Sequence, residues 1–162
     1  MHAAPKAASA WLSKPVACTA RSALLPHLRT AEQFAAVLNA SKQRTPSEPA
    51  AQRRLQGVYR SAHFALHVAG AALWPESPAQ QVTLGVIAPK RWAKRAVTRN
   101  LIKRQVYAVS HEMSARLPCA YMVVRQHAAF SREQFISASS KALKIAVRQE
   151  LLQLLAHVAQ PN

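Results

Sequence analysis

The stretch from Ala88 to Arg104, APKRWAKRAVTRNLIKR, holds seven lysines and arginines and no acidic residue. From Ala96 to Ala115 the sequence has helical periodicity, and at about 100° per residue its side chains separate into two sides. One side carries Leu101, Gln105, Thr98, Val109, Ile102, Met113 and Val106. The opposite side carries Arg99, Lys103, Tyr107, Asn100, Arg104, Ser110, Ser114 and His111. We therefore predict a helix that packs its apolar side on a sheet and presents cations on the other.

The charge balance of the whole chain points to a polyanionic partner. The 162 residues include 22 Lys and Arg, 6 Glu and no Asp, which gives a formal net charge of +16. A domain with this charge repels itself unless an anion neutralises it. A solvated face is the ordinary alternative, but such faces usually mix signs in i,i+4 pairs, and this one does not. Nucleic acid is the leading candidate, and an anionic membrane surface is the second.

The same composition argues against a nuclease centre in the polypeptide. Metal-assisted phosphodiester cleavage needs converging carboxylates, whereas the six glutamates are scattered along the chain. His63 and His67 form the strongest histidine pair, with no third ligand evident. No stretch approaches about 18 apolar residues, so we expect no transmembrane helix. Cys18 and Cys119 lack metal-ligand spacing and are expected to be reduced thiols, as in a cytosolic protein.

Periodicity along the chain predicts an α+β fold in one domain. Thr30 is suited to cap a first helix, and Ser131 with Gln134 fits a capping box that opens the last helix. Strands are expected at Tyr59–Gly70, Gln81–Ala88 and Ala120–Arg125, and a short extra strand between Gln52 and Gly57 is left open.

The strand expected at Tyr59–Gly70 alternates with a period of two. Phe64, Leu66 and Val68 fall on one face. The more polar face carries Tyr59, His63, Ala65 and His67. Such a strand places an apolar back against the core and leaves a front face for binding.

The basic helix and its surroundings resemble the signature of the bacterial ribonuclease P protein subunit. A glycine-containing strand and a basic connection, LGVIAPKRWAKR, lead into AVTRNLIKR. The resemblance spans roughly Leu28 to His157 and includes the helix with Phe34, the strand HFALH and the strand MVVR. Leu101 stands where the family has an arginine, and the N-terminal 25 residues have no clear match.

The resemblance implies a fold and a domain organisation. The family has a two-layer α/β sandwich with a four-stranded sheet, a left-handed βαβ crossover and the order α-β-β-β-α-β-α, as in the second domain of ribosomal protein S5. The domain would cover residues 28–158, with a polar insertion near 44–57 and a short tail at 159–162. Residues 1–27 would form a disordered basic tail, and an organellar transit peptide is the alternative for this region.

The resemblance also implies sites and partners. The residues that would bind the catalytic RNA are Lys90, Arg91, Lys94, Arg95, Arg99, Asn100, Lys103 and Arg104. The cleft for the single-stranded 5′ leader of precursor tRNA would be lined by Phe34, Leu38, His67 and Tyr107. No residue of the chain would be catalytic or hold a metal, because the RNA subunit supplies the active site and mainly holds Mg²⁺. Such a subunit is cytoplasmic, needs no membrane and requires no protein partner.

Two other functions stay open from the residues alone. A ribosomal protein or RNA chaperone fits the composition equally well, but it needs no groove for a leader. A DNA-binding helix is less favoured, because the apolar side of the basic helix is wide and the pattern is not a helix-turn-helix.

Overall fold

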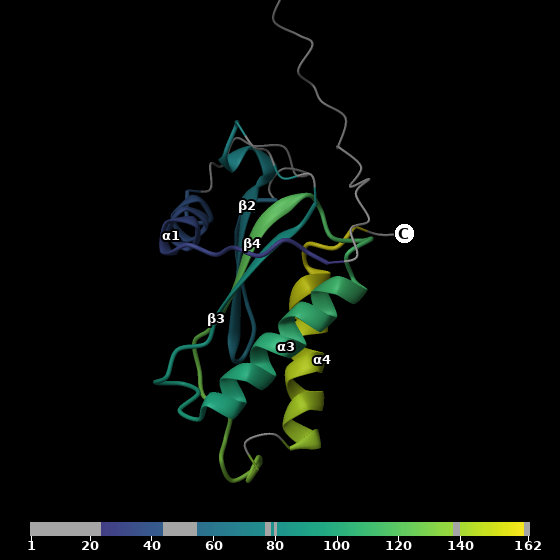
Figure 1. Cartoon of the computed structure of the whole chain (residues 1–162). Coiled ribbons are helices and arrows are strands. Elements are labelled where there is room, and N and C mark those ends of the chain that lie inside the picture. Colours follow the sequence, from purple (N-terminus) through teal and green to yellow (C-terminus); the bar gives the residue numbers. More distant parts are fainter. Residues whose placement is uncertain (1–23, 44–54, 77–78, 80, 138–139, 161–162) are drawn as a thin grey trace, which may run out of the picture.

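The computed structural model describes residues 24–43, 55–76, 79, 81–137 and 140–160. The helices are α1 (Ala31–Ala40), the short 3-10 helix η1 (Ala71–Leu73), α3 (Ala96–Glu112) and α4 (Lys141–Ala156). The strands are β1 (Gly57–Arg60), β2 (Phe64–Gly70), β3 (Thr83–Ile87) and β4 (Ala120–Gln126). The expected order of helices and strands is confirmed (Figure 1).

The strands form one sheet in the order β1-β2-β4-β3. β1 and β2 are an antiparallel hairpin, β2 and β4 are antiparallel, and β3 and β4 are parallel. α3 connects the two parallel neighbours, so β3, α3 and β4 form the expected βαβ unit. The left hand of this crossover stays a prediction.

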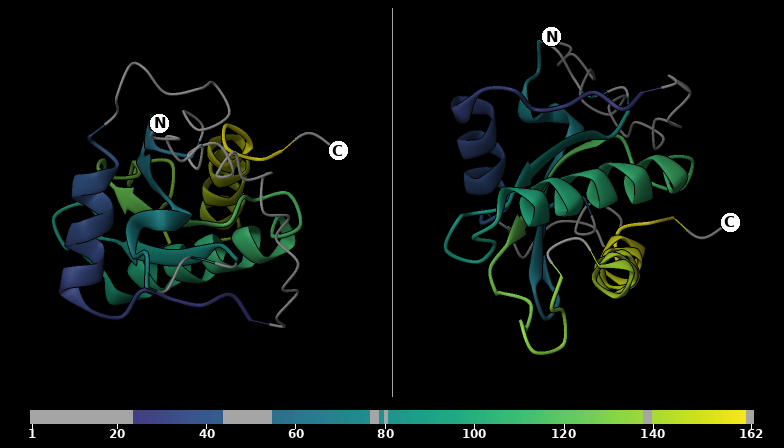
Figure 2. Two further views of the ribbon diagram at one scale, coloured as in Figure 1. Left: turned by 90° about the horizontal axis from the view of Figure 1, so that it is seen from above. Right: turned by 60° about the horizontal axis from the view of Figure 1, so that its bottom comes forward.

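Helices cover both faces of the sheet (Figures 1 and 2). Phe64, Leu66 and Met122 point to α3 and α4 and are fully buried in the larger core cluster. Val123 and Ala69 point the other way and join Val37 of α1 in a second cluster. The sandwich of the sheet with α3 and α4 was expected, and α1 adds a partial third layer.

The caps explain where the helices begin. Thr30 and Gln33 form a capping box at α1, which confirms the predicted start. The last helix begins nine residues later than predicted, because Ser140 caps α4 by accepting from the Leu143 N–H. The segment from Ser131 makes only a turn, in which the Phe135 N–H donates to the Ser131 carbonyl at 3.0 Å.

The strand predicted at Tyr59–Gly70 is two strands. The Ser61 N–H donates to the Phe64 carbonyl at 2.8 Å and closes a turn between β1 and β2. Tyr59 therefore lies opposite Leu66 and packs on the larger core, not on the face of His67. A period-two pattern does not reveal this turn, because the turn resets which side each residue faces.

The packed chain extends slightly beyond the expected domain limits. The Leu84 N–H donates to the Pro26 carbonyl at 3.0 Å, and the Leu28 N–H donates to the Leu84 carbonyl at 2.9 Å. Leu25, inside the expected tail, is buried in the larger core. Cys119 is disulfide-bonded, so the expectation of a reduced thiol is wrong there; Cys18 and most of the 44–57 insertion lie outside the described residues.

Candidate RNA-binding surface

The loop between β3 and α3 is held in one shape by backbone bonds and by Arg99. The N–H groups of Trp92 and Ala93 both donate to the Pro89 carbonyl, at 3.1 and 3.0 Å. Arg99 Nη1 donates to the carbonyls of Ala93 at 2.9 Å and Lys94 at 2.8 Å. Arg99 is therefore half-buried, and one nitrogen of its guanidinium group already holds the loop and is less available to a ligand.

The other predicted RNA-binding side chains are exposed and lie along this loop and α3. We call them the basic surface: Lys90, Arg91, Lys94, Arg95, Asn100, Lys103 and Arg104. Among the described residues the ion pairs join Arg148 to Glu112 and His63 to Glu150. No described carboxylate therefore neutralises the basic surface, which leaves it suited to phosphate.

The buried side of α3 differs slightly from the predicted one. Ile102, Val106 and Val109 are fully buried, as expected. Ser110 is also fully buried, because it lies one turn after Val106 on the same face. Its predicted place on the solvent side is wrong.

Tyr107 packs on the α3 side of the sheet. It is half-buried against the larger core, and its ring stacks on His27 with 4.0 Å between centroids. Burial raises the pKa of the Tyr107 phenol, so it stays a neutral hydrogen-bonding group.

Phe34 and Leu38 lie on the opposite face of the sheet. Both are half-buried and pack on the second cluster. A Cβ placed on Gly85 would lie 2.4 Å from Phe34 Cε1, so the ring rests directly on the backbone of β3. Glycine at position 85 allows this approach.

His67 is a buried partner of α1. Its side chain faces the α1 layer, is 5% exposed, and its Nδ1 lies 3.0 Å from Ser41 Oγ. Ser41 Oγ donates its hydrogen to the Leu38 carbonyl, so we assign His67 as the Nδ1–H tautomer that donates to Ser41. Burial, then the charges of Arg125, Lys42 and Arg60, lowers the pKa of His67 to about 4, so it is neutral at neutral pH.

The structure thus brings three of the four predicted leader-site residues to one side. Phe34, Leu38 and His67 share the α1 layer, whereas Tyr107 belongs to the layer of α3 and α4. Ser41 and Gly85 support the α1 side and had not been singled out for it. In the sequence, Ser41 is visible only as a polar residue after the first helix, and Gly85 only as a glycine inside a strand.

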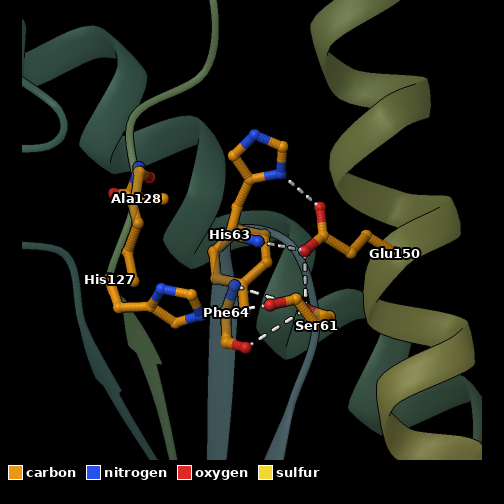
Figure 3. Close-up of polar contacts among 7 residues, drawn as sticks. Ser61, His63, Phe64, His127, Ala128 and Glu150 are labelled. Carbon is orange, nitrogen blue, oxygen red and sulfur yellow. Dashed lines mark hydrogen bonds and ion pairs between the residues drawn. The ribbon is translucent and has the colours of Figure 1, made fainter.

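The histidine pair considered for metal binding is divided between the two sides. His63 lies in the turn before β2, and its Nδ1 is 2.8 Å from Glu150 Oε2 on α4 (Figure 3). Burial raises the pKa of Glu150, but hydrogen bonds from Ser61 Oγ and from the backbone and ring of His63 outweigh it and lower the pKa overall. This cluster joins the β1–β2 turn to α4.

Two features are absent from the described residues. They contain no group of three or more His, Cys, Asp or Glu placed to hold a metal ion. None of the helices in the described part of the chain is long and apolar enough to cross a membrane.

Comparison with known proteins gives one consistent result. A family model described as Ribonuclease P matches residues 26–150. A protein from Ralstonia pickettii named Ribonuclease P protein component is 36% identical over 107 residues, covering 66% of this chain and 71% of that protein. One of the same name from Bordetella parapertussis is 35% identical over 106 residues, covering 65% of this chain and 81% of that protein. The solved RNase P protein of Staphylococcus aureus superposes with a TM-score of 0.54 at 13% identity, covering 80% of this chain and 92% of that one.

Proposed function

The chain belongs to the ribonuclease P protein family, and from this premise we propose that its basic surface binds the catalytic RNA while the α1 side of its sheet receives the 5′ leader of precursor tRNA. As a member of the family it is the protein subunit of ribonuclease P, and the RNA subunit is the catalyst. We also propose that it works in the cytoplasm, where precursor tRNA is processed.

The observation that carries the RNA interface is the run of exposed cations without a described carboxylate partner. Arg and Lys neutralise phosphates and release counterions, which gives affinity without sequence preference. Arg99 holds the loop that carries Lys90, Arg91 and Lys94, so less conformational entropy is lost on binding. Asn100 is exposed beside these cations and adds a neutral donor and acceptor for bases or 2′-hydroxyls.

The leader site is supported by the packing of α1. Phe34 and Leu38 are half-buried on the sheet and leave part of each side chain accessible. An aromatic face of this kind stacks on unpaired bases of any sequence. His67 stabilises the end of α1 through Ser41, so its role is to position the helix.

We propose that Mg²⁺ is held mainly by the RNA. The basic surface reduces repulsion between phosphates that the folded RNA brings together. RNA and substrate would then assemble at a lower Mg²⁺ concentration, with no protein side chain as a ligand.

The salt dependence of binding tests the RNA interface. Lys103→Ala with Arg104→Ala removes two exposed cations of the basic surface, and Lys42→Ala with Arg116→Ala removes two exposed cations elsewhere. Each lost phosphate contact should reduce the slope of log K against log salt by about 0.7 to 0.9. We expect the first pair to flatten the slope for ribonuclease P RNA by about 1.5 and the control pair to leave it unchanged. Equal flattening by both pairs would contradict the assigned surface.

The leader site is tested with substrates that differ only in the leader. Phe34→Ala should weaken binding of precursor tRNA to the protein–RNA complex more than binding of mature tRNA. Leu152→Ala, a half-buried residue on α4, is the control and should affect both substrates alike. If Phe34→Ala also weakens both equally, Phe34 serves packing alone.

A further inference from the structure

A cavity of about 560 Å³ opens beside the basic surface. It is bounded by the loop before α3, the end of β4, the loop that follows it, and the first turn of α4. Figure 1 shows that α3 and α4 both begin at this lower end of the molecule. Its volume is within the range of about 300 to 1,000 Å³ that is usual for small-ligand sites.

Apolar side chains form about half of the cavity wall, and three of them are aromatic. Trp92, Phe130 and Phe135 line it and are half-buried, and Leu143 forms a buried part of the wall. Phe130 is fixed by stacking on His63, with 4.0 Å between centroids, and by an edge contact with Phe135 at 5.9 Å. Such walls suit a flat, apolar ring.

An exposed apolar side chain stands at the same cavity. Ile136 is 85% exposed and lines it, although the fold gives it no packing partner in either core cluster. A ligand ring that entered the cavity would cover part of this side chain and remove it from water.

Cations surround the apolar walls. Arg91, Lys94, Arg95 and Arg132 line the cavity and are exposed, and no carboxylate occurs among the described residues that line it. Arg91, Lys94 and Arg95 also belong to the basic surface, so the cavity is continuous with it. A ligand that joins a ring to a phosphate matches both parts.

The wall of the cavity also contains a buried hydrogen-bond acceptor that has no donor. Gln126 lines the cavity and is 1% exposed. Its Nε2 donates to the Ala128 carbonyl at 2.9 Å, which fixes the orientation of the amide. Gln126 Oε1 is buried and has no hydrogen-bond partner among the described residues, so the site lacks one donor.

We propose that this cavity binds a single unpaired nucleotide of the RNA partner, with its base between the aromatic walls and Ile136, an N–H of the base donating to Gln126 Oε1, and its phosphate held by Arg132 and the loop cations. A base can enter between the aromatic walls and Ile136 only when both of its faces are free of neighbouring bases, so it must be unpaired and unstacked. The base would stack while the phosphate stays at the charged rim. This inference rests on the proposed RNA interface and adds a base-accepting site to it.

The test uses adenosine monophosphate as a probe of the full chain, with inorganic phosphate as the comparison. In ¹⁵N-labelled protein, the mononucleotide should shift the indole N–H of Trp92 and the side-chain amide of Gln126. It should bind at least about fivefold more tightly than phosphate, because stacking contributes about 1 to 3 kcal/mol per base. Equal affinities for the two probes, or shifts confined to the α1 side, would overturn the proposal.

Variants assign the contacts. Arg132→Ala should weaken the mononucleotide about threefold to fivefold, whereas Arg116→Ala, at an exposed arginine in the turn after α3, should leave its affinity unchanged. Gln126→Leu should cost about tenfold, the value of one hydrogen bond. If that variant does not fold, Ile136→Ser, an exposed position, replaces it and should weaken the mononucleotide but not phosphate. Equal losses in Arg132→Ala and Arg116→Ala would reduce the site to general charge attraction.

This experiment is independent of the ribonuclease P activity. A chain that binds no mononucleotide yet supports precursor-tRNA cleavage loses only the cavity proposal. A chain that binds the mononucleotide but does not cooperate with ribonuclease P RNA loses the proposed function and keeps the site.

Discussion

Substituting Gly85 tests whether the position of Phe34 is fixed by the backbone of β3. The alanine Cβ would lie 2.4 Å from Phe34 Cε1 and 2.9 Å from Phe34 Cζ. Favourable carbon–carbon contacts are at about 3.5 to 4.0 Å, so the ring must move by about 1 Å. Overpacking of this kind usually costs about 1 to 3 kcal/mol. We expect Gly85→Ala to lower the free energy of unfolding by that amount.

The sequence offers a matched control at the end of another strand of the same sheet. Gly70 ends β2, and a Cβ placed there would meet nothing within 4 Å. Gly70→Ala should therefore leave the free energy of unfolding within about 0.5 kcal/mol of the parent, or raise it slightly, because alanine restricts the unfolded chain. Urea denaturation of both variants gives the comparison.

A double-mutant cycle identifies the cause. In a Phe34→Ala background the ring is gone and the only close contact left is Leu28 Cδ1 at 3.0 Å, the end of a flexible side chain, so Gly85→Ala should lose most of its cost. The coupling free energy should then be about 1 to 3 kcal/mol. A Gly85→Ala cost that persists without the Phe34 ring would refute the steric reasoning, as would an equal cost at Gly70.

Three further predictions concern the groups that support the site. Folding lowers the pKa of His67 from 6.5 to about 4. The contribution of neutral His67 to the free energy of unfolding is therefore complete above pH 6.5, and about 3 kcal/mol of it is lost as the pH falls toward 4. Urea titrations should show this loss in the parent and a smaller one in His67→Gln; identical slopes would contradict the assignment. Arg99→Lys should speed amide exchange in the loop that Arg99 holds through two carbonyls, while Lys103→Arg should not. Glu150→Gln should lower the free energy of unfolding at pH 7 by about 1 to 3 kcal/mol, because it weakens three hydrogen bonds to the β1–β2 turn, and below the pKa of Glu150 this difference should shrink.

Much of the fold is predictable where a helix-capping pattern or a sustained hydrophobic periodicity marks the element. The capping residues Thr30 and Gln33 mark the start of α1. The separation of apolar and basic residues on two sides of α3 predicts both its packing and its exposed cations. The last helix begins later than predicted. Ser131 and Gln134 match the capping-box pattern without starting a helix, and the row of buried apolar residues on α4 begins only at Leu143. A capping pattern alone therefore does not show that a helix starts there.

The candidate site is predictable in its charge and less so in its arrangement. A run of cations without acids indicates an interface, but it does not show that Arg99 turns back onto its own loop. The burial of His67 depends on α1 meeting β2, a contact between segments far apart in the sequence. The cavity lined by Gln126 depends on four segments meeting and leaves no signal in any one of them.

Cleavage of precursor tRNA at low Mg²⁺ tests the central claim most directly, with the protein alone, a bacterial ribonuclease P RNA alone, and the two mixed. The account predicts that only the mixture cleaves efficiently, at the mature 5′ end, and that Lys103→Ala with Arg104→Ala raises the Mg²⁺ requirement of the mixture. A mixture no better than the RNA alone, with protein that still binds RNA tightly, would contradict the assigned role.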